Sequence, residues 1–319
     1  MLIREIDLNL RPQWRKKIAV IDLGTNTFHL LIASLGDGKS TILHREKQAV
    51  KIGVGGINRG IITEGGIQRA VDCLRDFKKK LDEWKIIRVQ AFGTSALRNA
   101  TNGKEVIEKI KSETGIEINL ISGDQEAEYI YYGVRSAMDL GDEKSLVVDI
   151  GGGSVEFIIG NRDKISWKQS FEIGAQRLLE LYHKHDPITT EEVDQLNAHF
   201  EKFLDPLKVA IEKFNPITLA GSSGTFDTLS EIYCNKRGIP IDREAGETPL
   251  TIPDFFKIYE ELLSKNRIDR MGIPGMIEMR VDMIVVGSCL VNYLVRKYSF
   301  RNIRVSTYSL KEGVLATLR

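Results

Sequence analysis

The chain has 319 residues, of which 42% are hydrophobic and 28% are charged, which is the composition of a soluble globular protein with room for two domains. Lysine and arginine (45) nearly balance aspartate and glutamate (44), so no global positive field points to a nucleic-acid partner. The three cysteines are far apart in the sequence and odd in number, which predicts reduced thiols and a cytoplasmic protein. No apolar run reaches the length of about 18 residues that a membrane span needs, so we expect no membrane association.

The first part of the chain predicts a mixed α/β unit with strands and helices in the order βββαβαβα. It follows a short polar leader at residues 1–16. In chain order we expect a strand, turn and strand at 18–33, a strand at 41–45, a helix from Thr63, a strand at 86–92, a helix through 106–110, a strand at 116–121 and a helix that Ser122 to Asp124 cap.

A polar connection at residues 137–144 is the expected domain boundary, which gives domains at 1–140 and 141–307. Whether the C-terminal helix at 308–319 joins the first domain is left open. In the second unit we expect a hairpin at 146–160, a strand at 165–172, helices at 175–183 and 190–214, a strand at 217–220, a helix from Thr225, a loop at 235–253, helices at 255–263 and 282–298, a strand at 303–306 and a terminal helix. Three strands again precede helices, so we predict a duplicated fold.

Two hairpins share one design, in which an apolar strand ends in an acid and a turn of small residues leads into a second strand. A strand follows each turn where a P-loop or a Rossmann turn would have a helix. Backbone N–H groups and hydroxyls of the turns would hold phosphate oxygens from two sides. These phosphate-binding candidates are Gly24, Thr25, Asn26 and Thr27 in the first turn, and Gly151, Gly152, Gly153 and Ser154 in the second.

The acids that end the first strands, Asp22 and Asp149, are candidates for binding Mg²⁺ directly or through water. The alternative for both hairpins is a tight turn in which the aspartate only favours the turn conformation. Repetition of the design at matching places in successive units favours a phosphate site.

Three further features have a functional and a structural interpretation between which the residues alone do not decide. Arg98 follows a strand, and either its guanidinium binds a phosphate through two hydrogen bonds or it is an ordinary surface arginine. Glu126 lies early in a helix, where a carboxylate acts as a general base toward water or simply compensates the helix dipole. A turn of small residues would contact a phosphate or a nucleoside, or only reverse the chain; its members are Gly221, Ser222, Ser223 and Gly224.

Ordered stretches of the chain resemble motifs of a known family. They are Asp-Leu-Gly-Thr-Asn-Thr-Phe-His from Asp22, Gly-Thr-Ser-Ala-Leu-Arg from Gly93, Ile-Ser-Gly-Asp-Gln-Glu-Ala from Ile121, Val-Asp-Ile-Gly-Gly-Gly-Ser-Val-Glu from Val148 and Gly-Ser-Ser-Gly-Thr from Gly221. This is the pattern of the exopolyphosphatase/guanosine pentaphosphate phosphohydrolase family, and the resemblance runs from Ile18 to the C-terminus. It implies the actin/hexokinase/Hsp70-type, ribonuclease H-like fold, with an active site in the cleft between two duplicated α/β domains.

The resemblance also implies roles for individual residues. Glu126 matches the family's catalytic glutamate, Asp149 its metal- and water-associated aspartate, and Arg98 its phosphate-contacting arginine, while the two turns match its phosphate loops. The chain departs from the family at Gln125, where an acid is frequent. It also stops at Arg319 without the further helical domain of some members, so it is similar to the short, two-domain form.

We therefore expect a Mg²⁺-dependent phosphoanhydride hydrolase in which Glu126 orients and deprotonates water for in-line attack. Its substrate, and hence its partner, is inorganic polyphosphate or guanosine penta- or tetraphosphate, and the sequence does not rank them. Two other functions stay open, an actin-fold ATPase or kinase and a non-catalytic (p)ppGpp-binding regulator. Neither DNA nor a membrane is an expected partner, and a homodimer is left open.

Seven basic residues between Arg267 and Arg304 could together form a path that binds a polyanion. Their alternative is ordinary solvated surface, which is the usual place for runs of charge. The residues concerned are Arg267, Arg270, Arg280, Arg296, Lys297, Arg301 and Arg304.

Overall fold

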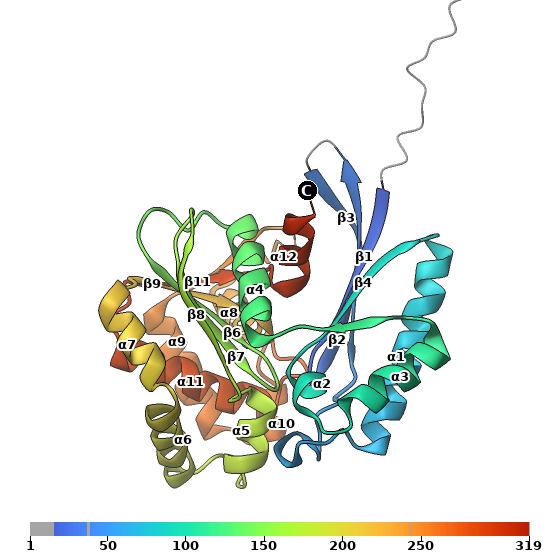
Figure 1. Ribbon diagram of the computed structural model, residues 1–319. Coiled ribbons are helices and arrows are strands. Elements are labelled where there is room, and N and C mark those ends of the chain that lie inside the picture. Colours follow the sequence, from blue (N-terminus) through green and yellow to red (C-terminus); the bar gives the residue numbers. More distant parts are fainter. Residues whose placement is uncertain (1–15, 37–38, 243, 319) are drawn as a thin grey trace, which may run out of the picture.

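The computed structural model describes residues 16–36, 39–242 and 244–318, and these form two mixed sheets with helices around them (Figure 1). The first sheet has the order β3-β2-β1-β4-β5 and the second has the order β10-β11-β9-β6-β7-β8. The strands of the first are β1 Lys16–Leu23, β2 Thr27–Gly36, β3 Lys39–Ala49, β4 Arg88–Gly93 and β5 Ile118–Leu120. Those of the second are β6 Ser145–Ile150, β7 Val155–Gly160, β8 Ile165–Phe171, β9 Thr218–Ser222, β10 Glu247–Leu250 and β11 Asn302–Ser306.

The two sheets repeat one topology. The first strand of each unit, β1 or β6, pairs antiparallel with the next strand along the chain. It pairs parallel on its other side with β4 or β9, which follows a helical crossover. The third strand, β3 or β8, continues the antiparallel edge. This shared order of antiparallel hairpin and parallel crossover confirms the predicted fold class of two duplicated α/β domains of the actin-like type.

Successive side chains of β1 point to opposite faces of the sheet, so they contribute to two separate layers of the core. Ala19 and Ile21 belong to the core cluster that α1 (Glu64–Glu83) and α3 (Gly103–Thr114) cover, on the face away from the second unit (Figure 1). Ile18 and Val20 face the other way, into a cluster shared with α4 (Gly123–Ala137), α12 (Leu310–Thr317) and residues of the second sheet. The core therefore continues from one sheet to the other through these two helices.

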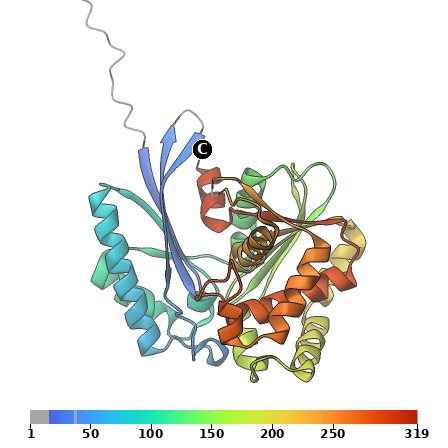
Figure 2. The same cartoon turned by 180° about the vertical axis from the view of Figure 1, so that it is seen from behind.

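Helices α4 and α12 lie side by side between the sheets in both views (Figures 1 and 2). Two glycines allow the helices to approach closely. A Cβ atom at Gly313 would overlap the carbonyl of Tyr129, and one at Gly133 would overlap the carbonyl of Ser309. Helix α12 contacts α4 and β1, whereas α4 also contacts β7 and β8. The domain division at residues 140 and 141 stays a prediction.

The second unit buries its apolar residues between its sheet and a set of helices. These are α5 Ala175–Tyr182, α6 Thr190–Phe203, α7 Asp205–Phe214, α8 Ser223–Arg237, α9 Ile252–Ser264, α10 Arg267–Met271 and α11 Met283–Lys297. In the first unit, α2 (Ser95–Asn99) and the 3₁₀ turn η1 (Ile57–Arg59) complete the helical elements. In the part of the chain described, no helix combines the length and the apolar character needed to cross a bilayer.

Several expected elements differ from the structure. The single helix expected at 190–214 is two helices, because Pro206 occupies the first turn of α7 and a new helix begins there. The loop expected at 235–253 contains the end of α8, all of β10 and the start of α9. Gly221 to Gly224 form the junction from β9 to α8 and not a separate turn. The short helices α2 and α10 were not expected, and the leader at residues 1–15 lies outside the described residues.

Candidate active site

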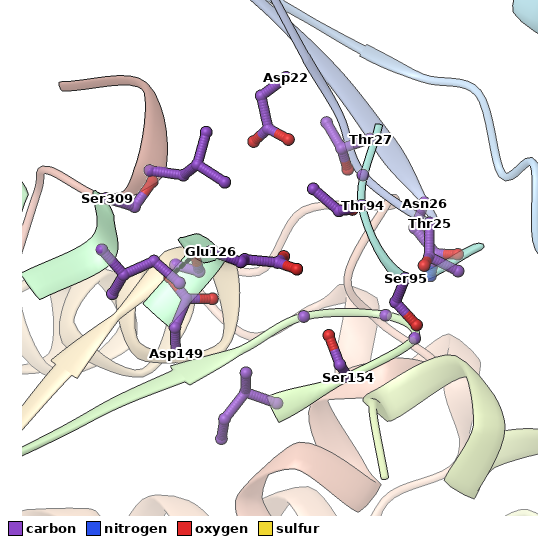
Figure 3. A pocket seen from close by; sticks show the side chains of 18 of the residues that line it. Asp22, Thr25, Asn26, Thr27, Thr94, Ser95, Glu126, Asp149, Ser154 and Ser309 are labelled. Carbon is purple, nitrogen blue, oxygen red and sulfur yellow. Dashed lines mark hydrogen bonds between the residues drawn. The ribbon is translucent and has the colours of Figure 1, made fainter. Parts of the chain in front are cut away.

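A cavity of about 80 Å³ lies where the two hairpin turns meet (Figure 3). Both turns are closed by the same bond, from Gly24 N–H to the Thr27 carbonyl at 3.2 Å and from Gly151 N–H to the Ser154 carbonyl at 3.1 Å. A Cβ atom at Gly24 would lie 2.9 Å from the Thr27 oxygen, which leaves no room for a side chain, and one at Gly151 would make a tight contact of 3.0 Å with the Ser154 oxygen. The duplicated sequence pattern is therefore also a duplicated geometry.

The two turns touch one another across the cavity. A Cβ atom at Gly153 would lie 2.5 Å from Thr25 Oγ1 and 2.5 Å from Ser95 Oγ, and one at Gly152 would lie 3.1 Å from the Asn26 side chain. Only glycine lets the second turn come this close to the first. The two turns thus meet at a small polar cavity.

The N-terminus of α5 holds the second turn in place. Ala175 and Gln176 N–H donate to the carbonyls of Gly151 and Gly152 at 2.8 Å each. Among residues 16–36, 39–242 and 244–318, the N–H groups of Gly152 and Gly153 have no acceptor. With its carbonyls engaged by α5, the turn offers these free N–H groups to an anion.

Three carboxylates line the cavity, those of Asp22, Glu126 and Asp149 (Figure 3). Burial raises the pKa of Glu126 to about 8, against the opposing effect of Arg98. Burial raises the pKa of Asp22 to about 7, although Lys311 acts to lower it. Burial also raises the pKa of Asp149. The structure therefore brings three carboxylates with raised pKa to one cavity, which is a common property of active sites.

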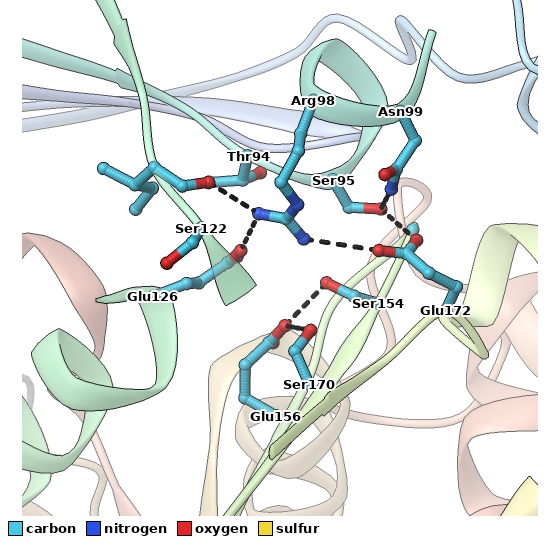
Figure 4. A network of polar contacts seen from close by, with 12 residues as sticks. Thr94, Ser95, Arg98, Asn99, Ser122, Glu126, Ser154, Glu156, Ser170 and Glu172 are labelled. Atoms are coloured by element: carbon cyan, nitrogen blue, oxygen red, sulfur yellow. Dashed lines mark hydrogen bonds and ion pairs between the residues drawn. The ribbon is translucent and has the colours of Figure 1, made fainter. Parts of the chain in front are cut away.

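Arg98 contacts Glu126 and does not line the cavity. Its Nη1 donates to Glu126 Oε2 at 2.8 Å and to the Ile121 carbonyl at 3.0 Å, and its Nη2 lies 3.4 Å from Glu172 Oε1 (Figure 4). Ser95 Oγ donates to the other oxygen of Glu172 at 2.6 Å. The guanidinium that we expected on a phosphate is here held between two carboxylates.

Only Ser223 of the four residues at the β9–α8 junction lines the cavity. Its hydroxyl donates to Asp149 Oδ2 at 2.6 Å, and its φ of 67° places it in the left-handed region, which is strained for a residue with a side chain. Ser222 donates to the Tyr308 carbonyl. A Cβ atom at Gly221 would overlap the Phe226 ring, and one at Gly224 would overlap the Arg280 guanidinium. Gly221 and Gly224 therefore serve packing in this structure, whereas a hydrogen bond from Ser222 acts to lower the pKa of Asp149.

Gln125, where the family often has an acid, is part of the cap of α4. Its Oε1 accepts from Ser122 N–H at 3.1 Å, while Ser122 Oγ accepts from Gln125 N–H at 3.2 Å. This reciprocal capping box fixes the first turn of the helix that carries Glu126.

Sequence reasoning missed Glu156, which lies directly opposite Asp149 in the β6–β7 pairing. Its side chain is buried, and Oε1 accepts from Ser154 Oγ and Ser170 Oγ at 2.7 Å each (Figure 4). Burial raises the pKa of Glu156, and the nearby Glu126 adds to the effect. The signal was present in the sequence, because a hairpin closed by the Gly151–Ser154 bond pairs Asp149 with Glu156.

Arg280 and His29 also line the cavity without having been expected there. His29 is the cross-strand partner of Asp22, so each hairpin pairs its acid with a second titratable residue. Burial, Lys311 and Arg280 together hold the pKa of His29 well below its usual value. Arg280 supplies positive charge near Asp149, and Asp149 in turn acts to raise the pKa of Arg280 against its burial.

The carboxylate oxygens of Asp22 and Asp149 suit a hard divalent cation that also binds oxygens of the substrate. No group of three or more His, Cys, Asp or Glu residues in the described ranges forms a metal site. The side chain of Asp22 makes no hydrogen bond or ion pair with another described residue, and the Asp149 carboxylate has hydrogen bonds only with the hydroxyls of Ser222 and Ser223 among the described residues. Mg²⁺ commonly binds through one or two carboxylates plus water and phosphate oxygens, so two carboxylates at a phosphate cavity suit it.

Comparisons with known proteins agree on one family. The model of the Ppx/GppA phosphatase family matches residues 31–318. The crystal structure of an exopolyphosphatase from Cytophaga hutchinsonii is 46% identical, with a TM-score of 0.92 over 95% of this chain and 97% of that one. The crystal structure of the Aquifex aeolicus family member is 30% identical, with a TM-score of 0.78 over 95% of this chain and 97% of that one.

Curated relatives carry two different names. A putative exopolyphosphatase from Haemophilus influenzae is 29% identical over 315 residues, which is 98% of this chain and 95% of the relative. A guanosine-5'-triphosphate,3'-diphosphate pyrophosphatase from Photobacterium profundum is 29% identical over 297 residues, which is 93% of this chain. The chain spans only 58% of the length of this second relative.

Proposed function

Because this chain belongs to the Ppx/GppA phosphatase family, we propose that it hydrolyses phosphoanhydrides, releasing orthophosphate from the end of inorganic polyphosphate, from guanosine pentaphosphate, or from both. One observation carries the proposal. Glu126, whose pKa burial raises to about 8, lines the same small cavity as the free N–H groups of Gly152 and Gly153. A carboxylate with a pKa near neutrality beside an anion site is suited to deprotonate water next to a phosphate.

The terminal phosphoryl group lies between the two turns in this proposal. The free N–H groups of Gly152 and Gly153, together with the hydroxyl of Thr25, hold its oxygens, and the charge of Arg280 favours the dianion. Expulsion of bulk water from so small a cavity strengthens each of these interactions, because the local dielectric constant falls. The contact of Gly153 with Thr25 brings both turns within reach of one phosphate.

Glu126 accepts a proton from water as the water oxygen attacks the terminal phosphorus. The bond from phosphorus to the bridging oxygen breaks in line with the attack, which yields orthophosphate and a substrate one phosphate shorter. Arg98 acts on Glu126 in this proposal, since its Nη1 donates to the carboxylate. We infer that it sets the protonation state and orientation of the base.

Mg²⁺ is the proposed cofactor, and the carboxylates of Asp22 and Asp149, which both line the cavity, would hold it. When bound, it would neutralise charge on the phosphates. Ser223 orients Asp149 by donating to Oδ2. A homodimer is still left open, as it was from the sequence.

The cytoplasm remains the proposed location. Cys73, Cys234 and Cys289 are all buried and free, which is the usual state of cysteines in a reducing compartment.

The test is release of orthophosphate with Mg²⁺ from polyphosphate and from guanosine pentaphosphate, measured side by side with ATP in the presence and absence of candidate acceptors. Release from either of the first two supports the proposal. Consumption of ATP only with an acceptor would show a kinase. Binding of guanosine tetraphosphate without release from any linear phosphate would show a regulator.

A further inference from the structure

Glu172 lies just after β8 and contacts side chains of both units. Its Oε2 accepts from Ser95 Oγ at 2.6 Å, and Arg98 Nη2 donates to its Oε1 at 3.4 Å (Figure 4). Arg177 Nη2 donates to Oε2 at 2.9 Å. Ser95 and Arg98 belong to α2 of the first unit, whereas Glu172 and Arg177 belong to the second. One carboxylate therefore receives three donors from two units.

On the side of the first unit, Glu172 shares the Arg98 guanidinium with the proposed base. Nη1 of Arg98 donates to Glu126 Oε2 at 2.8 Å, while Nη2 donates to Glu172. A guanidinium is planar and its donors form a rigid fork, so a partner on one nitrogen fixes the direction in which the other nitrogen points. The position of Glu172 therefore helps to set the angle at which Arg98 meets the carboxylate of Glu126.

On the side of the second unit, Glu172 holds an arginine that contacts the anion-binding turn. Arg177 Nε donates to the Gly153 carbonyl at 2.8 Å, and its Nη1 donates to the Ile57 carbonyl of the first unit at 2.8 Å. The N–H group of Gly153 is one of the two that this turn offers to an anion. Arg177 thus ties the turn to the first unit, and Glu172 fixes the remaining nitrogen of its guanidinium.

These three charged side chains lie outside the cavity. Arg98, Glu172 and Arg177 do not line it, whereas Glu126 and Gly153, which the two arginines contact, do. The side chain of Glu172 is 43% exposed, and ion pairs at such exposure contribute little to stability because water screens them. Its three contacts therefore serve the orientation of the two guanidiniums more than the stability of the fold.

We propose that Glu172 is a positioning residue, which holds Arg98 on the proposed base and Arg177 on the second turn, so that base and anion site keep one relative placement across the two units. The inference rests on the proposed function and deepens it, because it names a residue outside the cavity that orients the groups inside. Among the described residues, Glu172 is the carboxylate that contacts both guanidiniums.

The kinetics of phosphate release test the inference with Glu172→Gln, which keeps the size of the side chain and removes its charge. We expect kcat to fall about tenfold, the effect of losing one charge-assisted hydrogen bond, and KM to stay within about twofold because Glu172 lies outside the cavity. Glu172→Asp keeps the charge and should recover part of the loss.

Glu180→Gln is the matched control for contact between the units. Glu180 also joins them, by accepting from Gly55 N–H at 2.9 Å and from Asn58 Nδ2 at 3.3 Å, but it forms no ion pair with Arg98 or Arg177. We expect this variant to keep kcat within about twofold of the unmodified enzyme. A loss as large as that of Glu172→Gln would mean that Glu172 serves only the contact between the units, and would overturn the inference.

A double-mutant cycle shows whether Glu172 acts through Arg98. Arg98→Met removes the guanidinium, so adding Glu172→Gln to it should change kcat by about twofold or less. A tenfold loss that persists without Arg98 would contradict the inference. A kcat within twofold of the unmodified enzyme for Glu172→Gln alone would contradict it as well.

Nuclear magnetic resonance separates this inference from the proposed function, because it needs no turnover. Glu172→Gln should shift the Nε–H resonance of Arg98 and the amide resonances of Gly152 and Gly153, and Glu180→Gln should leave them in place. Such shifts in a protein that releases phosphate from no substrate would sustain the arrangement and refute the hydrolase. Unmoved resonances in a protein that hydrolyses polyphosphate would sustain the hydrolase and refute the positioning role.

Discussion

Arg98 Nη1 lies 2.8 Å from Glu126 Oε2, so the proposed base forms an ion pair with a guanidinium. Two effects act on this carboxyl in opposite directions. Burial raises its pKa and Arg98 lowers it, and burial prevails because the pKa is about 8. Burial and Arg98 together therefore keep the pKa of Glu126 close to neutral pH, where a general base can both take up and release a proton.

Replacing Arg98 should move the pH dependence of the reaction. The base acts when deprotonated, so kcat/KM of the unmodified enzyme should rise with pH through a midpoint near 8, the pKa of Glu126. Arg98→Met removes the effect that lowers this pKa, so the rise should shift to higher pH, and Arg98→Lys should restore part of the shift. The measurement is kcat/KM from pH 6 to 10. A large increase in KM with an unmoved midpoint would show that Arg98 contacts phosphate instead.

Glu126→Gln removes the base while keeping the shape of the side chain. Loss of a general base lowers rates by about 10²–10⁴. We expect kcat for orthophosphate release to fall by that range with little change in KM, because the substrate is held by the hairpin turns and not by this carboxylate. Steady-state kinetics at saturating Mg²⁺ measure both constants. Activity within threefold of the unmodified enzyme would exclude Glu126 from the role.

Ser223 offers a way to separate strain from orientation at the proposed metal site. Both Ser223→Ala and Ser223→Gly lose the hydrogen bond to Asp149, so both should shift the Mg²⁺ activation curve to higher concentration, in the same direction as Asp149→Asn. Only glycine relieves the left-handed backbone at φ 67°, so Ser223→Gly should be more stable than Ser223→Ala by about 1 kcal/mol. Mg²⁺ titrations and urea unfolding measure the two effects. Unchanged titrations in all three variants would argue against metal binding at Asp149.

Local pattern was enough to predict every described strand except β10, the duplication and the two hairpin turns. The alternation of apolar and polar residues, and the apolar runs that end in Asp22 and Asp149, can be read from short stretches of sequence. The geometry of the two turns follows from small residues at a fixed spacing. The partners across the site were not predictable in this way. Glu126 meets the guanidinium of Arg98, 28 residues earlier in the chain, and this contact depends on how the helices of the first unit pack. Gly153 packs on Thr25 of the other hairpin, and that contact depends on how the two units meet. The assigned roles of these residues stay predictions.

The basic residues that a polyanion path would need are mostly engaged with acids. Arg270 is buried and donates to Asp186 at 2.8 Å. Arg267 pairs with Asp282 at 3.2 Å and Arg304 with Glu247 at 2.6 Å. Lys297 pairs with Glu201. Retention of a long polymer after each cleavage requires many simultaneous contacts with free cations, and these side chains already have partners.

We therefore expect this enzyme to release a polyphosphate chain frequently between cleavages. Each release lets the enzyme bind another chain end, so chains of many intermediate lengths should accumulate during the reaction. The measurement is digestion of a long polyphosphate with the products resolved by length on a gel at several times. The effect should strengthen with added salt, because the remaining contacts are electrostatic and exposed. Full-length polymer that persists beside orthophosphate, with nothing of intermediate length, would mean processive hydrolysis and a cationic path elsewhere on the molecule.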